Sequence, residues 1–181
     1  MTDPVPRPDP TERLEAAYRA IHTERMQGIP MVNPALGVAA VGFSEWEGHW
    51  LGVMVTPWFM NLMLLPRDPG AWESLRIGAK RKYALPAGEY EFIGGDDLAI
   101  GEYQMCSLFS PMFDFADMET AALTAKLALE AVLDVAHAER PAEPEPTPVT
   151  RPLDEIKRAV EAPISKRDFL RGAFFGRVDR G

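Results

Sequence analysis

The sequence contains little cysteine and histidine, and its first 150 residues offer no basic face. Cys106 is the one cysteine among 181 residues, which excludes an internal disulfide framework and cysteine-rich zinc or iron–sulfur sites and favours a reducing compartment. The three histidines, His22, His49 and His137, do not stand at metal-ligand spacing. The net charge of -8 argues against nucleic acid as a partner, because phosphate binding requires a basic surface. We therefore expect a cytoplasmic protein without a metal, a cofactor or a nucleic-acid partner.

The sequence also lacks a secretory signal and a clear membrane span. Its first twelve residues, MTDPVPRPDPTE, alternate proline with polar residues, so we do not expect export. Residues 50–66 form an uncharged run of 17 residues, at the lower edge of what crosses a bilayer. Gly52, Thr56, Pro57 and Asn61 interrupt this run. The pattern predicts two buried strands that meet at Thr56 and Pro57.

Two segments have the period of amphipathic helices. The first covers residues 9–27, with Asp9 as the N-cap. The second covers residues 117–140, with Asp117 as the N-cap. Residues 72–83 are a candidate for a further helix. The predicted buried side of the first helix consists of Leu14, Ala17, Tyr18 and Ile21, and that of the second of Leu123, Leu127, Leu129, Val132, Leu133 and Val135.

Between residues 36 and 109 the pattern changes to strands, with short apolar or alternating runs separated by Gly and Pro pairs. In GEYEF, Tyr90 and Phe92 fall on one face of a strand and two glutamates on the other. In residues 100–109, Tyr103, Met105 and Phe109 are predicted to face away from Cys106 and its alternate neighbours. Short connections favour antiparallel pairing. The expected fold is α+β, a central mostly antiparallel sheet packed by two main helices.

The composition divides the chain into four parts. We expect a flexible N-terminus at residues 1–8, an α+β domain at 9–140, a proline-rich linker at 141–152 and a basic amphipathic tail at 153–181. Residues 151–181 carry about +3 and residues 1–150 about -11. The tail is either a docking peptide for a partner or a strap that folds back on the acidic body. Its docking candidates are Lys166, Arg167, Phe169, Leu170 and Arg171.

The residues do not assemble into an evident active site. Cys106 would be a nucleophile if the sheet brought His49 beside it, but MCSLFSP has no nucleophile elbow, and a structural role for the thiol is favoured. Asp96 and Asp97 sit in the turn FIGGDD, which is a hairpin signal and not a phosphate loop. We expect a protein that is not an enzyme, with a Cys106-dependent enzyme as the alternative.

The sequence also contains many large apolar side chains. It has nine methionines, and methionine suits both irregular cores and surfaces that adapt to a flexible apolar peptide. We expect most of them in the core and some at the edge of a surface that reversibly buries a segment of another protein. The candidates for this surface are Trp50, Trp58, Phe59, Met60, Met63, Phe109, Met112 and Phe113.

Two patterns carry a resemblance to a known family. The first is G-x-W-x-G-x-x-x-T-P-W, formed by Gly48, Trp50, Gly52, Thr56, Pro57 and Trp58. The second is C-S-L-x-S-P, formed by Cys106, Ser107, Leu108, Ser110 and Pro111. Together, and with EGHWLGVMVTPWFMNLMLLP and LPAGEYEFIGGDDLAIGEYQMCSLFSPMFDFAD around them, they resemble the [NiFe]-hydrogenase assembly chaperones of the HybE type, also called HupJ or HoxT. The resemblance covers about residues 12–137 and resumes at KRDFLRGAFFGR.

The resemblance implies a cytoplasmic maturation factor. Such a protein binds the small subunit precursor, the large one or both while cofactors are installed, and it holds back premature export by the twin-arginine route. Other maturation proteins are further expected partners. The resemblance identifies no catalytic residue, and the appended rubredoxin of some relatives is excluded by the single cysteine. A regulatory subunit that stays in the mature complex is the other alternative.

The tail contains SKRDFLR at residues 165–171, which is similar to the twin-arginine signal pattern S-R-R-x-F-L-K. Its C-terminal position and the few apolar residues after it argue against an export signal. Two interpretations stay open. The tail imitates the signal peptide of a client and occupies the same groove, or the similarity is a chance feature of a basic tail.

Overall fold

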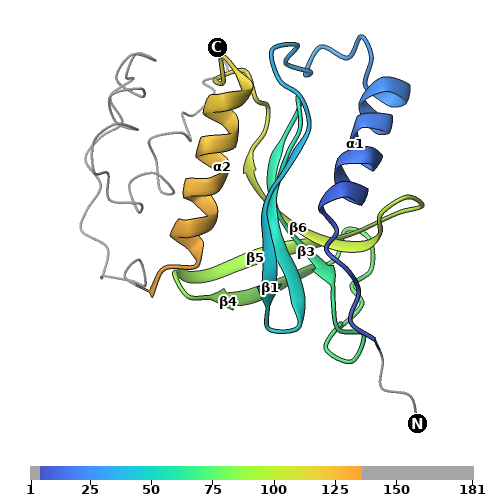
Figure 1. Cartoon of the computed structure of the whole chain (residues 1–181), viewed down its shortest axis with the longest axis vertical. Helices are drawn as coiled ribbons and strands as arrows, with labels where there is room; N and C mark the ends of the chain where they lie inside the picture. Colours follow the sequence, from blue (N-terminus) through green and yellow to red (C-terminus); the bar gives the residue numbers. More distant parts are fainter. Residues whose placement is uncertain (1–4, 136–181) are drawn as a thin grey trace.

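The computed structural model describes residues 5–135 as a six-stranded sheet with one helix against each face (Figure 1). The helices are α1 (Thr11–Arg25) and α2 (Met118–Val132). The strands are β1 (Ala39–Trp46), β2 (His49–Val55), β3 (Met60–Pro66), β4 (Lys80–Leu85), β5 (Gly88–Asp97) and β6 (Gly101–Phe109). Their spatial order is β1-β2-β3-β6-β5-β4 with every pair antiparallel, which confirms the predicted α+β class. The predicted linker at 141–152 and tail at 153–181 lie outside the described residues.

The uncharged run at residues 50–66 forms neighbouring strands in the middle of the sheet, as predicted. β2 and β3 are buried almost throughout, and the turn between them lies at Thr56 and Pro57. The hydroxyl oxygen of Thr56 accepts hydrogen bonds from the backbone N–H groups of Trp58, at 3.3 Å, and Phe59, at 3.0 Å. No helix among residues 5–135 is long and apolar enough to cross a membrane.

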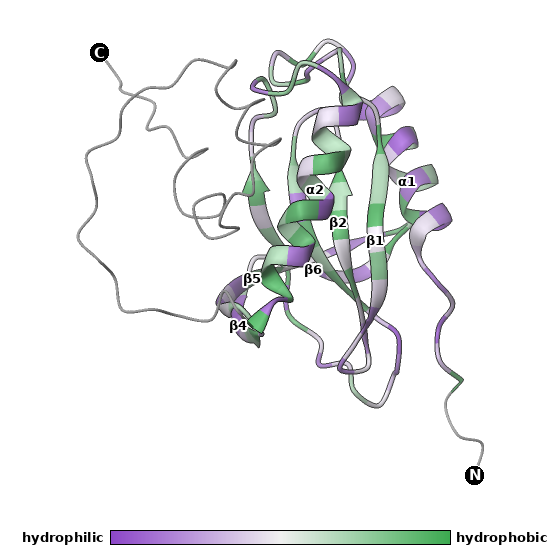
Figure 2. Ribbon diagram, turned by 60° about the vertical axis from the view of Figure 1, so that its left-hand side comes forward, coloured by the Kyte–Doolittle hydropathy of each residue, from purple (hydrophilic) through white to green (hydrophobic). Residues whose placement is uncertain are grey.

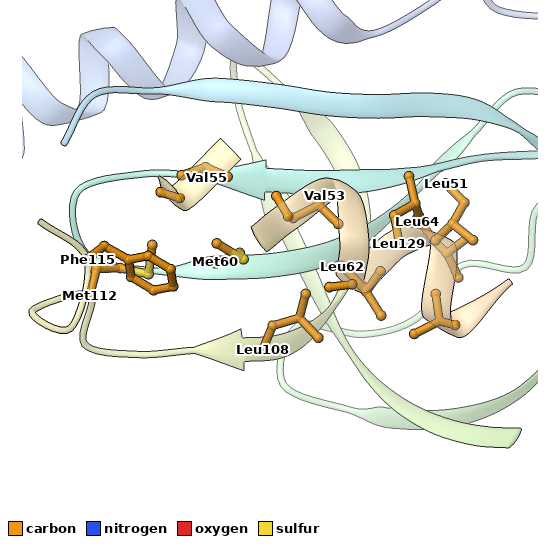
Figure 3. Close-up of a cluster of buried hydrophobic side chains, with 14 of the residues drawn as sticks. Leu51, Val53, Val55, Met60, Leu62, Leu64, Leu108, Met112, Phe115 and Leu129 are labelled. Carbon is orange, nitrogen blue, oxygen red and sulfur yellow. The ribbon is translucent and has the colours of Figure 1, made fainter. Parts of the chain in front are cut away.

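Both faces of β2 and β3 are buried because each is covered by its own helix. On one face, Leu51, Val53 and Leu62 pack under α2 (Figure 3). On the other face, Met54, Met63 and Leu65 pack in the cluster that includes Leu14, Ala17 and Tyr18 of α1. Burial of one such side chain contributes about 1.5–3 kcal/mol, so these two strands hold much of the stability of the fold.

The prediction of a helix at residues 72–83 is wrong. Residues 72–79 are irregular, and β4 follows them and pairs with β5. Side chains in KRKYAL alternate between solvent and the sheet, and Lys80 and Lys82 form ion pairs of 2.8 Å with Glu91 and Glu89 across the strands. Cross-strand pairing therefore fixes the structure of a segment whose local sequence is ambiguous.

The orientation predicted for α2 is partly wrong. Asp117 caps the helix as expected, with its carboxylate accepting the Thr120 N–H at 2.7 Å. The side toward the sheet, however, is mostly small, because Ala121, Ala125 and Ala128 allow the helix to approach the strands closely. Of the residues predicted as buried, Leu123 is 43% exposed, Leu127 is half-buried, and Val135, beyond the end of the helix, is 72% exposed.

The face predicted for Phe109 is also wrong. Tyr103 and Met105 pack on the α1 side of the sheet, whereas Phe109 packs on the α2 side and contacts Phe115 at 5.2 Å between ring centroids. The pairing of β3 with β6 shifts register between Met60 and Asn61, and the extra residue in β6 reverses the alternation there.

Candidate functional site

The two motifs of the sequence meet at one end of the sheet. Met60, two residues after Trp58 of the T-P-W turn, pairs with Phe109 inside the C-S-L-x-S-P segment. The Ser110 hydroxyl donates a hydrogen bond of 3.4 Å to the carbonyl oxygen of Trp58. Figure 3 shows Met112 and Phe115 beside Met60 and Val55 at the turn between β2 and β3. Segments about 50 residues apart in the sequence are thus side by side.

Asn33 connects a third segment to this end. Its backbone N–H donates to the carbonyl oxygen of Pro57 at 2.8 Å. Its buried side-chain amide donates to the carbonyl oxygens of Met112, at 3.0 Å, and Phe115, at 2.8 Å. One side chain therefore ties the loop after α1 to the loop before α2, so the relative positions of the three segments are fixed.

Large apolar side chains reach solvent from these three segments. We call them the turn-end surface, which consists of Ile29, Met31, Phe59, Phe109 and Phe113. Phe113 is 54% exposed, Met31 41% and Ile29 36%, and the other two are half-buried. Phe59 packs on the α1 side of the sheet and Phe109 on the α2 side, so the surface wraps around the end of the sheet.

The candidate residues from the sequence divide into three groups. Phe59, Phe109 and Phe113 belong to the turn-end surface. Four others, Trp58, Met60, Met63 and Met112, are buried in the two cores beneath it. Trp50 is not brought to them: it lies near the opposite end of β2, where its indole N–H donates to the Arg7 carbonyl at 3.1 Å and the Arg67 guanidinium lies over its ring.

Ile29 and Met31 were not singled out from the sequence. They lie in QGIPMVNP, a loop with glycine and prolines that interrupts helical and strand periodicity. Two large apolar residues in such a loop are unusual enough to mark a surface, but the sequence does not show that this loop joins the T-P-W turn. That link depends on Asn33, whose partners are remote in the chain.

Among the other motif residues, Gly48 shapes a turn. Glu47 and Gly48 form the turn between β1 and β2, with φ values of 47° and 80°. Glycine adopts such a positive φ more readily than any other residue, which explains its presence at position 48. A Cβ at Gly48 would also lie 2.7 Å from that of Ala71. Pro57 and Leu108 are buried, whereas Ser107 and Pro111 are exposed.

Cys106 lacks the setting of a nucleophile. It is partly buried on the α2 side of the sheet, and burial, reinforced by the charge of Glu91, raises the pKa of its thiol. Reactive cysteines need the opposite shift. Cys106 pairs with Leu62, which pairs with Val53, so His49 is two strands across and four residues along, roughly 16 Å away.

His49 is instead enclosed by aromatic rings. Trp72, Trp46 and Tyr83 have ring centroids 5.6, 6.3 and 6.4 Å from the imidazole. Its Nδ1 has no hydrogen-bond partner among residues 5–135, and burial lowers the pKa of the ring. Within the same residues, no three His, Cys, Asp or Glu side chains gather as a metal site would require.

Comparison with known proteins identifies the family. The sequence model described as "[NiFe]-hydrogenase assembly, chaperone, HybE" matches residues 9–172. The chain belongs to the HybE family. Its HybE-type relatives include the hydrogenase expression/formation protein HupJ of Bradyrhizobium diazoefficiens, 39% identical over 179 residues, 95% of this chain and 96% of that protein.

Another HybE-family relative is the probable rubredoxin HupJ of Rhodobacter capsulatus, 41% identical over 130 residues. The match spans 72% of this chain and 46% of that longer protein. The solution structure of HybE from Escherichia coli is similar in fold, with a TM-score of 0.59 and 22% identity, over 84% of this chain and 98% of that one. The resemblance found in the motifs is therefore confirmed.

Proposed function

We propose that this HybE-family chain is a cytoplasmic, non-catalytic chaperone that binds a [NiFe]-hydrogenase subunit precursor through its turn-end surface. Binding covers an apolar segment of the precursor during cofactor assembly and before twin-arginine export. Membership of the HybE family supports the hydrogenase as the client system. The convergence of the two motifs on one exposed apolar end is the observation that carries the choice of surface.

The shape of the surface suits a reversible interaction. Phe113, Met31 and Ile29 already have much of their area in water, so a client gains apolar burial without unfolding the chaperone. The backbone beneath is held by the hydrogen bonds of Asn33 and Thr56, so little order has to be created on binding. Five large side chains offer a limited apolar area, which favours an affinity low enough for release.

The setting of Cys106 supports the absence of catalysis. A half-buried thiol with a raised pKa and a remote imidazole fits a structural residue of β6. Cys106→Ser is therefore expected to keep client binding, because the thiol contributes packing and no turnover. Loss of a measurable thiol-dependent reaction on this substitution would favour the enzyme alternative instead.

The decisive experiment is affinity capture from cells that produce the hydrogenase, with precursor and mature subunits distinguished by mass. The wild-type chain is expected to retain precursor and not mature subunit. Phe113→Ala is expected to weaken retention about tenfold, as truncation of a central aromatic contact does. Its matched control is Leu98→Ala, because Leu98 is fully exposed in the turn between β5 and β6, away from the surface.

Two outcomes would contradict the proposal. Equal retention by the wild type and Phe113→Ala, with both folded by circular dichroism, would show that the turn-end surface is not the site. Stable retention of the mature enzyme would show that the chain is a regulatory subunit of the finished complex.

A further inference from the structure

The outward face of α2 is unusual because two of the larger apolar residues of the helix lie on it. Alanines fill most of the buried side together with Leu129 and Val132, while Leu123 is 43% exposed and Leu127, one turn later, is half-buried. Residues four apart lie on the same side of a helix, so the two leucines form one stripe. α2 faces the viewer in Figure 2, and hydrophobic and hydrophilic residues both lie on the side that it presents.

Acidic residues border this leucine stripe. Glu119 precedes Leu123 by one turn, and Glu130 follows Leu127 by about one turn, and both glutamates are exposed. The two glutamates are eleven residues apart, about 16 Å along the helix axis. We call Glu119, Leu123, Leu127 and Glu130 the α2 outer face. The exposed Lys126 lies on the same side, so this face offers two apolar contacts, two negative charges and one positive charge.

The chain supplies a segment of matching chemistry. Residues 166–171, KRDFLR, place Phe169 and Leu170 between Lys166 and Arg171. In an extended segment Arg167, Phe169 and Arg171 lie on one face, and the two arginines are about 13 Å apart, so their long side chains can reach the two glutamates. Residues 5–135 contain eighteen Asp and Glu against ten Lys and Arg, whereas residues 166–181 contain two against five. The long-range attraction therefore also favours contact between them.

We propose that the α2 outer face is the docking site for residues 166–175 of the same chain. Phe169 covers Leu123 and Leu127, while Arg167 and Arg171, on the same face of the segment, lie near Glu119 and Glu130. This inference does not rest on the proposed function, because it uses a different surface from the turn-end surface, and client capture can fail or succeed independently of it.

The length of the connection permits this docking. α2 is the last described element, and residues 136–165 separate it from the docking segment. Thirty residues can span at most about 100 Å, several times the roughly 20 Å length of α2. Because both partners belong to one chain, docking is intramolecular, so a contact too weak to form between separate molecules can suffice.

The test uses the full chain with a paramagnetic label in the tail. Cys106→Ser removes the native thiol, and Ala173→Cys provides the attachment point. Methyl signals of Leu123 and Leu127 are expected to lose more than half of their intensity, whereas those of Leu98 stay unchanged. Replacing Lys166, Arg167 and Arg171 by glutamate is expected to abolish the loss, and raising the salt concentration to reduce it. If Cys106→Ser alters the spectrum, Cys106→Ala is the second background.

Two results would overturn the proposal. Equal intensity loss at Leu123, Leu127 and Leu98 would place the tail elsewhere. The second result would come from a mixture of isotope-labelled chains without the paramagnetic label and paramagnetic chains without isotope. Intensity loss in that mixture equal to the loss within one chain would make a second copy the occupant.

Discussion

Gly52 gives the sharpest test of how the motif acts, because its role follows directly from the packing. The ring of Phe43 in β1 lies against the backbone of Gly52 in β2. A Cβ at position 52 would be 2.5 Å from Cγ and Cδ2 of that ring and 2.8 Å from Cδ1. These distances are well below van der Waals contact, so the ring would have to move by about 1 Å.

Movement of the Phe43 ring would disturb the packing around it. The ring packs against the α1-side core, and the strand bulges beside it, with the register shifting between Val41 and Ser44. Overpacking of a core costs typically 1–3 kcal/mol. Gly52→Ala is therefore expected to lower the free energy of unfolding by about 2 kcal/mol, which corresponds to roughly 4–8 °C in Tm for a chain of this size.

A double-mutant cycle separates this clash from a general intolerance of β2. Phe43→Ala alone removes a half-buried ring and is expected to destabilise the fold by about 2 kcal/mol. In the double variant the methyl group introduced at position 52 occupies part of the vacated space, so the combined cost should be about 2 kcal/mol less than the sum.

The measurement is urea unfolding followed by tryptophan fluorescence. Gly37→Ala is the matched control, because a Cβ there would meet no atom within 4 Å, and it is expected to change stability by less than about 0.5 kcal/mol. If Gly52→Ala were as stable as this control, or if its cost simply added to that of Phe43→Ala, the packing argument would be refuted.

Two further predictions concern buried polar groups. Burial lowers the pKa of His49, and the charges of Glu47, Asp68 and Glu73 oppose this shift. Because the pKa in the folded chain is below the unfolded value of about 6.5, the unfolded chain binds more protons as the pH falls, and the stability of the fold falls with it. His49→Phe should reduce the fall in urea midpoint between pH 7 and pH 5, and identical pH profiles would contradict this. Asn33→Ala leaves two carbonyl oxygens without their donor and should cost about 2–3 kcal/mol in the same assay at pH 7, whereas a loss below about 0.5 kcal/mol would show that water replaces the amide.

Features set by local chemistry could be predicted from the sequence. Thr56 and Pro57 mark the turn between β2 and β3 because proline and a hydroxyl near backbone N–H groups favour a turn. Asp117 marks the start of α2 because a carboxylate satisfies the first N–H groups of a helix. Tyr90 and Phe92 alternate with glutamates because one side of β5 packs on the core.

Features set by distant partners could not be predicted. β4 is a strand because β5 lies beside it, and KRKYAL alone does not decide between helix and strand. α2 presents alanines to the sheet because close approach outweighs the burial of Leu123, and this depends on the shape of the strands beneath. Phe109 changes face because of a bulge that one strand cannot specify.

In the turn-end surface, the motif residues that could be recognised from the sequence differ from the residues that reach solvent. Trp58, Pro57 and Leu108 belong to the two motifs and are buried, so they set the backbone positions of the neighbouring residues. The residues that reach solvent stand beside them: Phe59 follows T-P-W, and Phe109 occupies the unspecified position of C-S-L-x-S-P. Under the proposed function, exchanging Phe59 or Phe109 should weaken precursor binding more than it lowers stability, whereas exchanging Trp58 should do the reverse.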